Sequence, residues 1–340
     1  MRKPDFEHNL LRALRGERPE RATMFELFLY DELYERLAGH GWDGKTRLSY
    51  KKMVVDAMAA GGYDYAPFLL PDFYYPKQAR ERASTHSLNG QGIITDWESF
   101  EKYVWPDISR CDLSILDALA DYMPEGMKLC LRGPGGVLEN TIAIVGYDNL
   151  CYLLYDDPEL VQAITDKIGS TMVSLYEALA GHEAIGFLCS NDDWGFNTQT
   201  FLSPEAMRRY IFPWHKKIVA AAHAAGKPCM LHSCGEFRAV IDDIVEDMGF
   251  DARHSYEDNI CPVEDAYELL NGRITVMGGI DMNLMTSGTP DAIYARARAM
   301  LERTAERGGY TLGTGNSIAP YIPIENYMAL RQAALDTDNA

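Results

Sequence analysis

The stretches that decide the fold are "AIGFLCS" at residues 184–190 and "KPCMLHS" at residues 227–233. Each is a short apolar run of the kind that forms a buried strand. Between them, residues 203–227 have the periodicity of a helix, with Ser203 placed as its N-cap and Pro204 at its first helical position. A strand, a helix and a second strand in this order predict a parallel sheet.

Short apolar runs alternate with helical patterns along the whole chain. Residues 46–62 end in two glycines, a common helix stop, and residues 289–309 begin with a Thr-Pro pair. Eight strands with intervening helices predict an α/β fold, a single (β/α)8 TIM barrel over residues 1–340, and a doubly wound open sheet is the alternative. The eight predicted strands are residues 22–28, 63–70, 127–132, 184–190, 227–233, 250–255, 273–280 and 309–315.

Two segments stand outside this alternation. We expect the residues before the first strand to form an N-terminal helical extension. Residues 84–95 contain Asn89-Gly90 between β-like runs, which predicts a small β-hairpin inserted after the second strand.

Composition and charge narrow the class of protein. The chain has 340 residues, of which 47% are hydrophobic, and a formal net charge of −18. Such an acidic surface repels phosphate backbones, so no nucleic acid is expected as a partner.

No apolar run is long enough to span a bilayer, and the N-terminus lacks the apolar centre of a secretion signal, so we expect no membrane association and a cytoplasmic location. The seven cysteines are odd in number and dispersed, which disfavours a disulfide framework.

Polar residues recur at the carboxyl ends of the predicted strands, where (β/α)8 barrels carry their catalytic groups. Each of these residues alone is as readily a helix cap or a loop residue, but their recurrence predicts a site at the barrel mouth. Because neighbouring strand residues point to opposite faces, only one carboxylate of the Asp192-Asp193 pair can face that mouth, and the other can cap a loop. The strand-end residues are Glu26, Arg132, Asp192, Asp193, His232, Cys234, His254, Glu257, Asp258, Asp281 and Asn316.

His232 and Cys234 are the strongest metal-ligand candidates. A spacing of two residues puts both side chains on one face of a continuing strand, and imidazole with thiolate suits Zn²⁺. The alternative is a polar strand end that happens to contain both residue types. Catalytic zinc takes three protein ligands, so a third must come from elsewhere in the chain.

From about residue 184 to residue 335, the chain resembles the uroporphyrinogen decarboxylase superfamily, which includes corrinoid-linked methyltransferases. This resemblance implies a (β/α)8 barrel, in agreement with the strand count. The stretches that carry it are "DDWGFNTQTFLSPEAMRRYIFPWHKKIV" at 192–219, "MLHSCG" at 230–235, "VMGGIDMNLMTSGTP" at 276–290 and "GGYTLGTGNSIAPYIPIENY" at 308–327.

This chain differs from the superfamily pattern at two places, and these differences indicate which branch it resembles more. True uroporphyrinogen decarboxylases share an Arg-rich loop near the N-terminus, where this chain has "MFELFLYDELYERLAG" at residues 24–39. The methyltransferase branch carries His-x-Cys, matched by His232 and Cys234, and a later Cys, whose position falls near Asn316. The chain is therefore closer to the methyltransferase branch, and its third ligand stays open among Asp193, Glu26, His254 and Asn316.

The resemblance implies a zinc-dependent methyltransferase that moves a methyl group between a small O-methyl substrate and a corrinoid (cobalamin) carried by a partner protein. The partners would be that corrinoid protein and a small-molecule methyl donor or acceptor, and a homodimer stays open. The alternatives are a decarboxylase of a carboxylated pyrrolic or aromatic substrate and a non-catalytic corrinoid- or small-molecule-binding barrel. The expected metal ligands are His232 and Cys234; the expected catalytic residues are Asp193, His254 and Glu26; the expected substrate-binding residues are Arg132, Asp281, Asn316 and Glu257.

Overall fold

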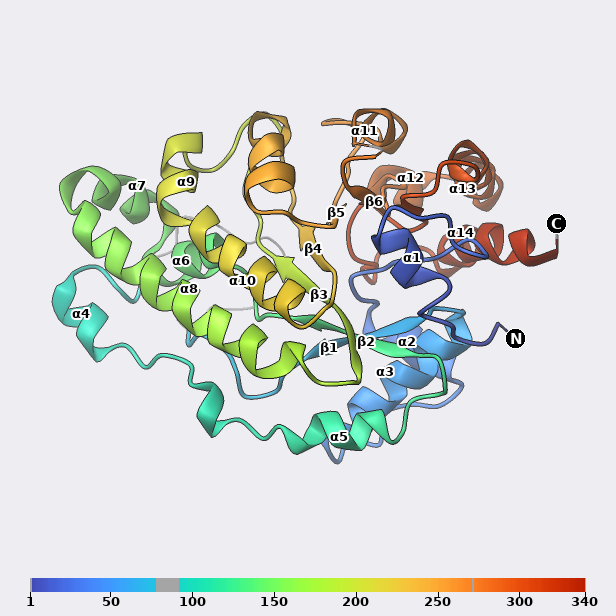
Figure 1. Ribbon diagram of the computed structural model, residues 1–340, viewed down its shortest axis with the longest axis horizontal. Coiled ribbons are helices and arrows are strands. Elements are labelled where there is room, and N and C mark those ends of the chain that lie inside the picture. Colours follow the sequence, from blue (N-terminus) through green and yellow to red (C-terminus); the bar gives the residue numbers. More distant parts are fainter. Residues whose placement is uncertain (1, 78–91, 271, 340) are drawn as a thin grey trace.

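The computed structural model describes residues 2–77, 92–270 and 272–339 (Figure 1). Its centre is a curled sheet of seven parallel strands in which every strand pairs with its neighbours in chain order. Helical crossovers between successive strands produce this order. The α/β class and seven of the predicted strands are therefore confirmed. The strands are β1 (Tyr65–Leu69), β2 (Lys128–Arg132), β3 (Ile185–Asn191), β4 (Cys229–His232), β5 (Ala252–His254), β6 (Thr275–Met277) and β7 (Tyr310–Thr311).

The prediction of a regular strand at residues 22–28 is wrong. This segment makes one parallel bridge, between Met24 and Leu312 just after β7. On its other side, the Glu26 N–H donates to the Tyr65 hydroxyl (2.8 Å), which itself donates to the Glu26 carbonyl (2.5 Å). The phenol thus occupies the backbone groups that a neighbouring strand would use. Residues 22–28 lie between β7 and β1, an arrangement consistent with a TIM-barrel fold.

The predicted helix at 203–227 is split into α9 (Pro204–Tyr210) and α10 (Phe212–Ala224). Pro213 lacks an N–H and its ring crowds the preceding turn, so a continuous helix through this point is disfavoured. The expected N-cap at Ser203 is present, since its hydroxyl accepts the Ala206 N–H at 3.2 Å.

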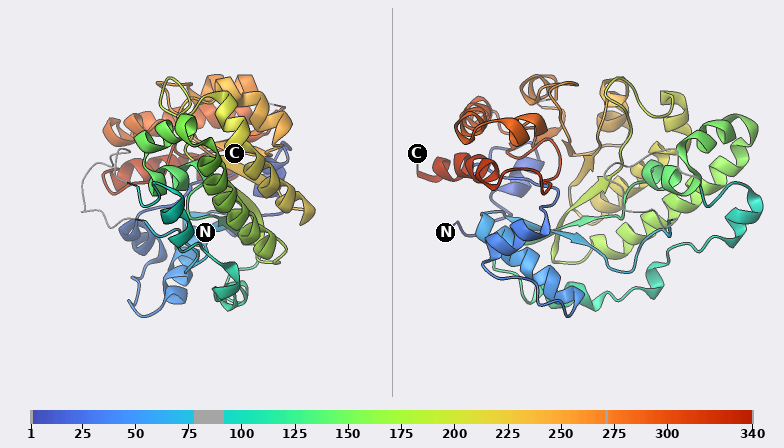
Figure 2. Two further views of the ribbon diagram at one scale, coloured as in Figure 1. Left: turned by 90° about the vertical axis from the view of Figure 1, so that its left-hand side faces the viewer. Right: turned by 180° about the vertical axis from the view of Figure 1, so that it is seen from behind.

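The helices form an outer layer around the sheet. In Figures 1 and 2, α8 and α10 lie side by side over one face, and both termini lie at the same side of the molecule. The other α-helices are α1 (Leu10–Leu14), α2 (Asp31–Ala38), α3 (Arg47–Gly61), α4 (Trp97–Lys102), α5 (Ser114–Ala120), α6 (Val137–Val145), α7 (Tyr147–Asp156), α8 (Pro158–Ala180), α11 (Val263–Leu270), α12 (Met282–Ser287), α13 (Pro290–Thr304) and α14 (Ile324–Leu335). Short 3-10 turns are Ile108–Arg110, Arg238–Val240 and Asp336–Asn339, and Asp243–Asp247 is a π turn.

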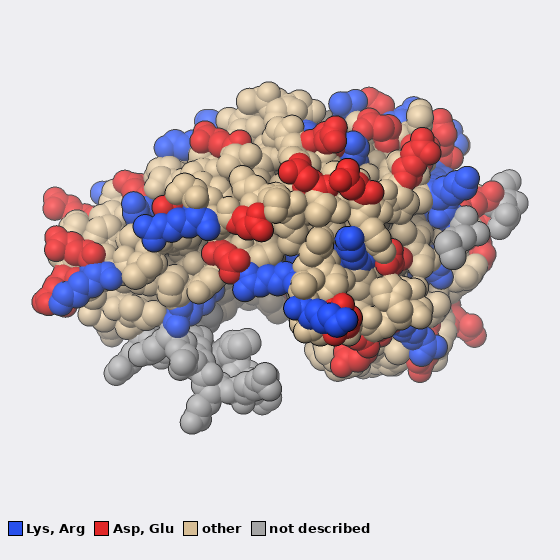
Figure 3. Space-filling view, turned by 90° about the horizontal axis from the view of Figure 1, so that it is seen from below, with Lys and Arg blue, Asp and Glu red and all other residues tan. Residues whose placement is uncertain are grey.

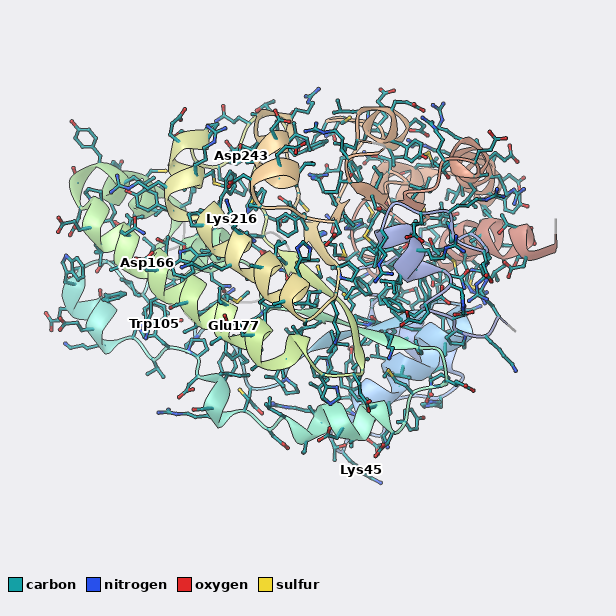
Figure 4. All side chains as sticks on the ribbon, in the orientation of Figure 1. Lys45, Trp105, Asp166, Glu177, Lys216 and Asp243 are labelled. Atoms are coloured by element: carbon teal, nitrogen blue, oxygen red, sulfur yellow. The ribbon has the colours of Figure 1, made fainter. Side chains whose placement is uncertain are left out.

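Charged residues lie on the outer layer and apolar ones inside it. Figure 4 shows Asp166 and Glu177 on α8 and Lys216 on α10, and basic and acidic groups are interspersed over the face in Figure 3. Inside, the rings of Phe25, Tyr65 and Phe187 contact one another in sequence, with centroids 5.6 Å and 5.2 Å apart. Within the described ranges, no helix combines the length and apolar character that a membrane crossing requires.

The predicted hairpin falls largely on residues 84–91, which lie outside the described residues. Residues 92–95, which are described, contain no strand.

Candidate metal centre

Three ligand-type side chains meet where β3 and β4 end. Asn191 and His232 are partners in the sheet register, which brings the residues that follow each strand together. The Nε2 atom of His232 lies 3.9 Å from the Cys234 sulfur and 4.0 Å from Asp193 Oδ1. All three ligand atoms lie within 4.8 Å of one another. With zinc bonds of about 2.0–2.3 Å, ligand atoms lie within about 4 Å of one another, so small side-chain shifts would close this cluster around one ion.

Gly235 holds the two loops together. Its φ of +90° favours glycine, and a Cβ at this position would lie 2.2 Å from the Gly195 carbonyl oxygen. The loop after Cys234 can therefore pass against the loop that carries Asp193. The backbone conformation and this close approach require glycine at position 235, whether or not a metal binds.

The two neighbouring aspartates have different surroundings. Asp193 faces the cluster, where Oδ1 accepts the Cys234 N–H at 3.0 Å. Asp192 is fully buried and accepts the backbone N–H groups of Leu138 (2.9 Å) and Glu139 (2.8 Å) at the start of α6. It also contacts His215 Nε2 at 2.9 Å. Asp192 thus caps a helix, and Asp193 alone is available to a ligand.

A chain of hydrogen bonds assigns the tautomer of His232. His254 Nε2 is 2.9 Å from the Thr314 carbonyl, which can only accept, so His254 carries its proton on Nε2. The two Nδ1 atoms of His254 and His232 are 2.7 Å apart. Since burial lowers the pKa of His254 to about 4, its ring is neutral and its Nδ1 accepts the His232 Nδ1–H. His232 therefore presents an unprotonated Nε2 to Cys234 and Asp193, as a metal ligand must.

Asn316, near the position where the resemblance places a cysteine as third ligand, donates to the Cys234 sulfur instead. Its Nδ2 is 3.2 Å from the sulfur, and its Oδ1 accepts the Ser317 N–H at 2.8 Å, which fixes the amide orientation. Burial, with the nearby Asp193 carboxylate, raises the pKa of Cys234 well above its usual range. The metal-free thiol is therefore protonated at neutral pH, and a bound cation would displace that proton.

The donor set suits a borderline-soft cation and leaves it accessible. It combines one nitrogen, one sulfur and one oxygen, a mixed set that zinc accepts. The Asp193 side chain is 41% exposed, whereas that of His232 is 8% exposed, so solvent and small molecules reach the cluster from the aspartate side. Three protein ligands with one open side are the arrangement of catalytic rather than structural zinc sites.

Glu26 does not join this cluster. It is buried and accepts the Thr314 N–H at 3.0 Å, and its Oε2 lies 2.6 Å from Thr314 Oγ1. That hydroxyl is also 2.6 Å from the Asn316 carbonyl, and its single proton cannot serve both acceptors. If Glu26 is protonated, it donates to Thr314 Oγ1, and the Thr314 hydroxyl then donates to the Asn316 carbonyl, so each oxygen has a hydrogen-bond partner. Burial, opposed in part by the Thr314 hydrogen bonds, raises the pKa of Glu26 to about 8, in agreement.

Of the predicted site residues that follow β5 and β6, one caps a helix and another lies beside the cluster. Asp281 caps α12, where Oδ1 accepts the Asn283 N–H at 2.8 Å, and its Oδ2 accepts the Asp258 N–H at 3.0 Å. Glu257 is half-buried, and burial, followed by the charges of Asp281 and Asp193, raises its pKa. Glu257 is therefore the ionisable group on the Asp193 side that is not tied into a cap.

Arg132 lies at the same end of the sheet but in a different cavity. This cavity has a volume of about 480 Å³ and also contains Lys51 of α3. Lys51 was not predicted as a site residue, because a lysine within a helix has no distinguishing local signal. Ser255 and Thr314, which support the metal centre from behind, were missed for the same reason.

Comparison with known proteins places the chain in a family. The model of the uroporphyrinogen decarboxylase (URO-D) family matches residues 134–336. The chain belongs to this family. Within it, a uroporphyrinogen decarboxylase from Syntrophotalea carbinolica is 27% identical over 180 residues, which cover 51% of this chain and 48% of the relative.

Other relatives are methyltransferases. A methylated-thiol–coenzyme M methyltransferase from Methanosarcina mazei is 24% identical over 57% of this chain and 49% of its own length. The methylcobamide:CoM methyltransferase MtaA from Methanosarcina barkeri is 30% identical over 38% of this chain and 36% of its own length. The chain thus spans about half, or less, of the length of these curated relatives.

Solved structures share the fold. A methyltransferase from Methanosarcina mazei superposes with a TM-score of 0.73 at 18% identity, over 99% of this chain and 100% of that one. A vitamin-B12-independent methionine synthase from Listeria monocytogenes gives a TM-score of 0.53 at 11% identity, over 100% of this chain and 98% of that one. At these identities the likeness establishes the α/β architecture and nothing finer.

Proposed function

We propose that this protein is a zinc-dependent methyltransferase that moves a methyl group between a small O-methyl substrate and a corrinoid held by a partner protein. The observation that carries the proposal is the cluster of Asp193, His232 and Cys234, with the free lone pair of His232 directed into it. The methyltransferases among the relatives support it, since the name of one includes methylcobamide.

The ligand roles follow from the contacts of the three side chains. His232 would bind through Nε2, Cys234 through its thiolate and Asp193 through a carboxylate oxygen. Zinc held there supplies Lewis acidity, which assists departure of an oxygen leaving group or, in the reverse direction, ionisation of an acceptor thiol. Asn316 donates a hydrogen bond to the sulfur and so moderates its charge.

Proton transfer falls to a residue other than His254. Both ring nitrogens of His254 are hydrogen-bonded and the residue is fully buried, so it orients His232 and has no path to substrate. Glu26 is likewise committed to Thr314. We assign the proton that a departing O-methyl oxygen requires to the Glu257 carboxyl, whose pKa is raised by burial and by neighbouring carboxylates.

Metal content measured alongside methyl transfer tests the proposal. Purified protein should hold one zinc per chain by elemental analysis and should demethylate methylcobalamin, or methylate cob(I)alamin, in an absorbance assay. Cys234→Ala and His232→Ala should each weaken zinc binding by more than about 100-fold and abolish transfer. Cys151→Ala is the matched control, because Cys151 is an exposed free thiol on α7.

Zinc binding that survives Cys234→Ala, or none after reconstitution, would overturn the metal mechanism. Zinc without any methyl transfer would favour the non-catalytic binding barrel.

Incubation with uroporphyrinogen under reducing, anaerobic conditions distinguishes the decarboxylase alternative from the methyltransferase proposal. The substrate of that reaction carries eight carboxylates, and the segment at 24–39 has Arg36 as its one arginine. We expect no conversion to coproporphyrinogen above background. Turnover at an enzyme-like rate would replace the methyltransferase proposal with decarboxylation.

A further inference from the structure

We propose that the cavity beside β1 and β2 binds the anionic end of the substrate, a carboxylate or a sulfonate, between Lys51 and Arg132. The cavity of about 480 Å³ lies at the carboxyl ends of these strands, and its wall includes Phe28, Tyr34 and Pro320. This volume suits a small organic molecule. The inference deepens the proposed function, on which it rests for the identity of the substrate.

Two cations, Lys51 and Arg132, line this cavity. Among the described residues, no carboxylate lies within ion-pair distance of Lys51 or Arg132. Arg132 instead lies over the Phe28 ring at 5.1 Å, and the Lys51 ammonium lies 5.6 Å from the centre of the Phe68 ring. Burial, and next the charge of Arg132, lower the pKa of Lys51 to about 8. An oxyanion between the two groups would relieve both the desolvation and the repulsion.

Lys51 and Arg132 can be compared with a cation of the same chain that has carboxylate partners. Arg296, for comparison, is held by Asp258 at 2.6 Å and by Glu264 at 2.8 Å. Two carboxylates, Asp31 and Glu32 at the start of α2, also line the cavity, and both are exposed. Asp31 accepts the Tyr50 hydroxyl at 2.7 Å.

The cavity lies at the same end of the sheet as the metal centre. Arg132 ends β2, which pairs with β3, and Pro320 belongs to the same loop as Asn316. An anion held here would place a small substrate at the end of the sheet that carries the cluster. Lys51 and Arg132 would then select substrates with a negative end.

A binding measurement that needs neither zinc nor turnover tests this assignment. Ligand-detected NMR titration of the full-length protein would use methoxyacetate, with methoxyacetamide as its neutral counterpart and 2-methoxyethanesulfonate as the sulfonate arm. We expect the wild type to bind an anion at least tenfold more tightly than the amide, and the better anion identifies the natural group. Lys51→Met with Arg132→Gln should weaken anion binding at least tenfold and leave amide binding unchanged.

The matched control is Lys45→Met, since Lys45 is an exposed lysine shortly before α3, at the outer edge of the molecule (Figure 4). Its anion affinity should equal that of the wild type, and all variants should keep the wild-type zinc content and circular dichroism spectrum. Equal binding of anion and amide, no detectable anion binding, or full anion binding by the double variant would overturn the proposal. Anion binding that follows these expectations in a protein without zinc or methyl transfer would refute the proposed function and leave this site standing.

Discussion

The metal centre on β3 and β4 and the cation cavity beside β1 and β2 lie at the same end of one sheet. They differ in how many of their polar groups have partners within the chain. In the metal centre, both ring nitrogens of His254, the Nδ1 atom of His232, the Asn316 amide and the Cys234 thiol have partners within the chain. In the cavity, Lys51 and Arg132 each lie by an aromatic ring, and neither has a carboxylate within ion-pair distance among the described residues. The first region is arranged before any ligand arrives, whereas the second becomes electrostatically satisfied only when an anion binds.

This difference teaches how the two regions respond to substitution. When one group is removed from a network of short hydrogen bonds, its neighbours lose a partner and their orientation is no longer fixed. Two unpaired cations in a cavity act through charge, and removing one lowers a repulsion. Substitutions at the metal centre should therefore cost stability or metal affinity, whereas those in the cavity should change substrate binding.

The largest expected effect comes from the fully buried member of the aspartate pair. Asp192→Ala removes the acceptor of two backbone N–H groups and of His215, and should lower the free energy of unfolding by about 4 kcal/mol or more. Asp193→Ala removes one partly exposed hydrogen bond and should cost about 1 kcal/mol or less. Urea denaturation of both variants checks this, and equal losses would contradict the division between a helix cap and a metal ligand.

Glu26, which is buried against Thr314, should make stability depend on pH. Its folded-state pKa of about 8 exceeds the ordinary 4.5, so its contribution is complete below pH 4.5, declines as pH rises, and is lost above about 8. Across that window the contribution falls by about 1.4 kcal/mol per pH unit. Denaturation between pH 5 and 9 should show wild type losing stability relative to Glu26→Gln. Parallel curves for the two proteins would mean that Glu26 is ionised in the folded state.

His254 should control zinc affinity without contacting zinc. His254→Leu removes the acceptor that holds the His232 proton on Nδ1, and should weaken zinc binding by about 10–100-fold. His254→Asn restores an acceptor near the Nδ1 position and should recover much of that loss. Competition with a zinc-binding dye measures both. Identical affinities for the leucine and asparagine variants would show that His254 acts through packing alone.

The smallest expected effect is that of the cavity on the metal centre. Arg132→Gln removes a positive charge that acts on His232, so zinc should bind slightly more tightly, by less than about fivefold. The same dye competition applies, with Lys45→Met as the reference. A marked loss of zinc in Arg132→Gln would mean that the two regions form one site.

Most of the sheet and two of the three members of the candidate metal cluster could be predicted from local patterns. Apolar runs with helix starts between them predicted seven strands in their observed places. The segment at 22–28 has the same pattern but fails as a strand, because Tyr65, 39 residues away from Glu26, takes its backbone hydrogen bonds. No local pattern carries that information.

What the sequence determined by itself is the order of the strands and the position of His232 and Cys234 at a strand end, because side-chain alternation and strand ends depend on neighbouring residues. Only the tertiary structure decided that Asp193 joins them, that His254 sets the tautomer of His232, and that Glu26 lies behind the site. It also brought Lys51 of α3 into the cavity with Arg132 of β2. These contacts join residues 22 to 288 positions apart. They depend on how the sheet curls and which helix covers it, and backbone preferences within a few residues do not specify that packing.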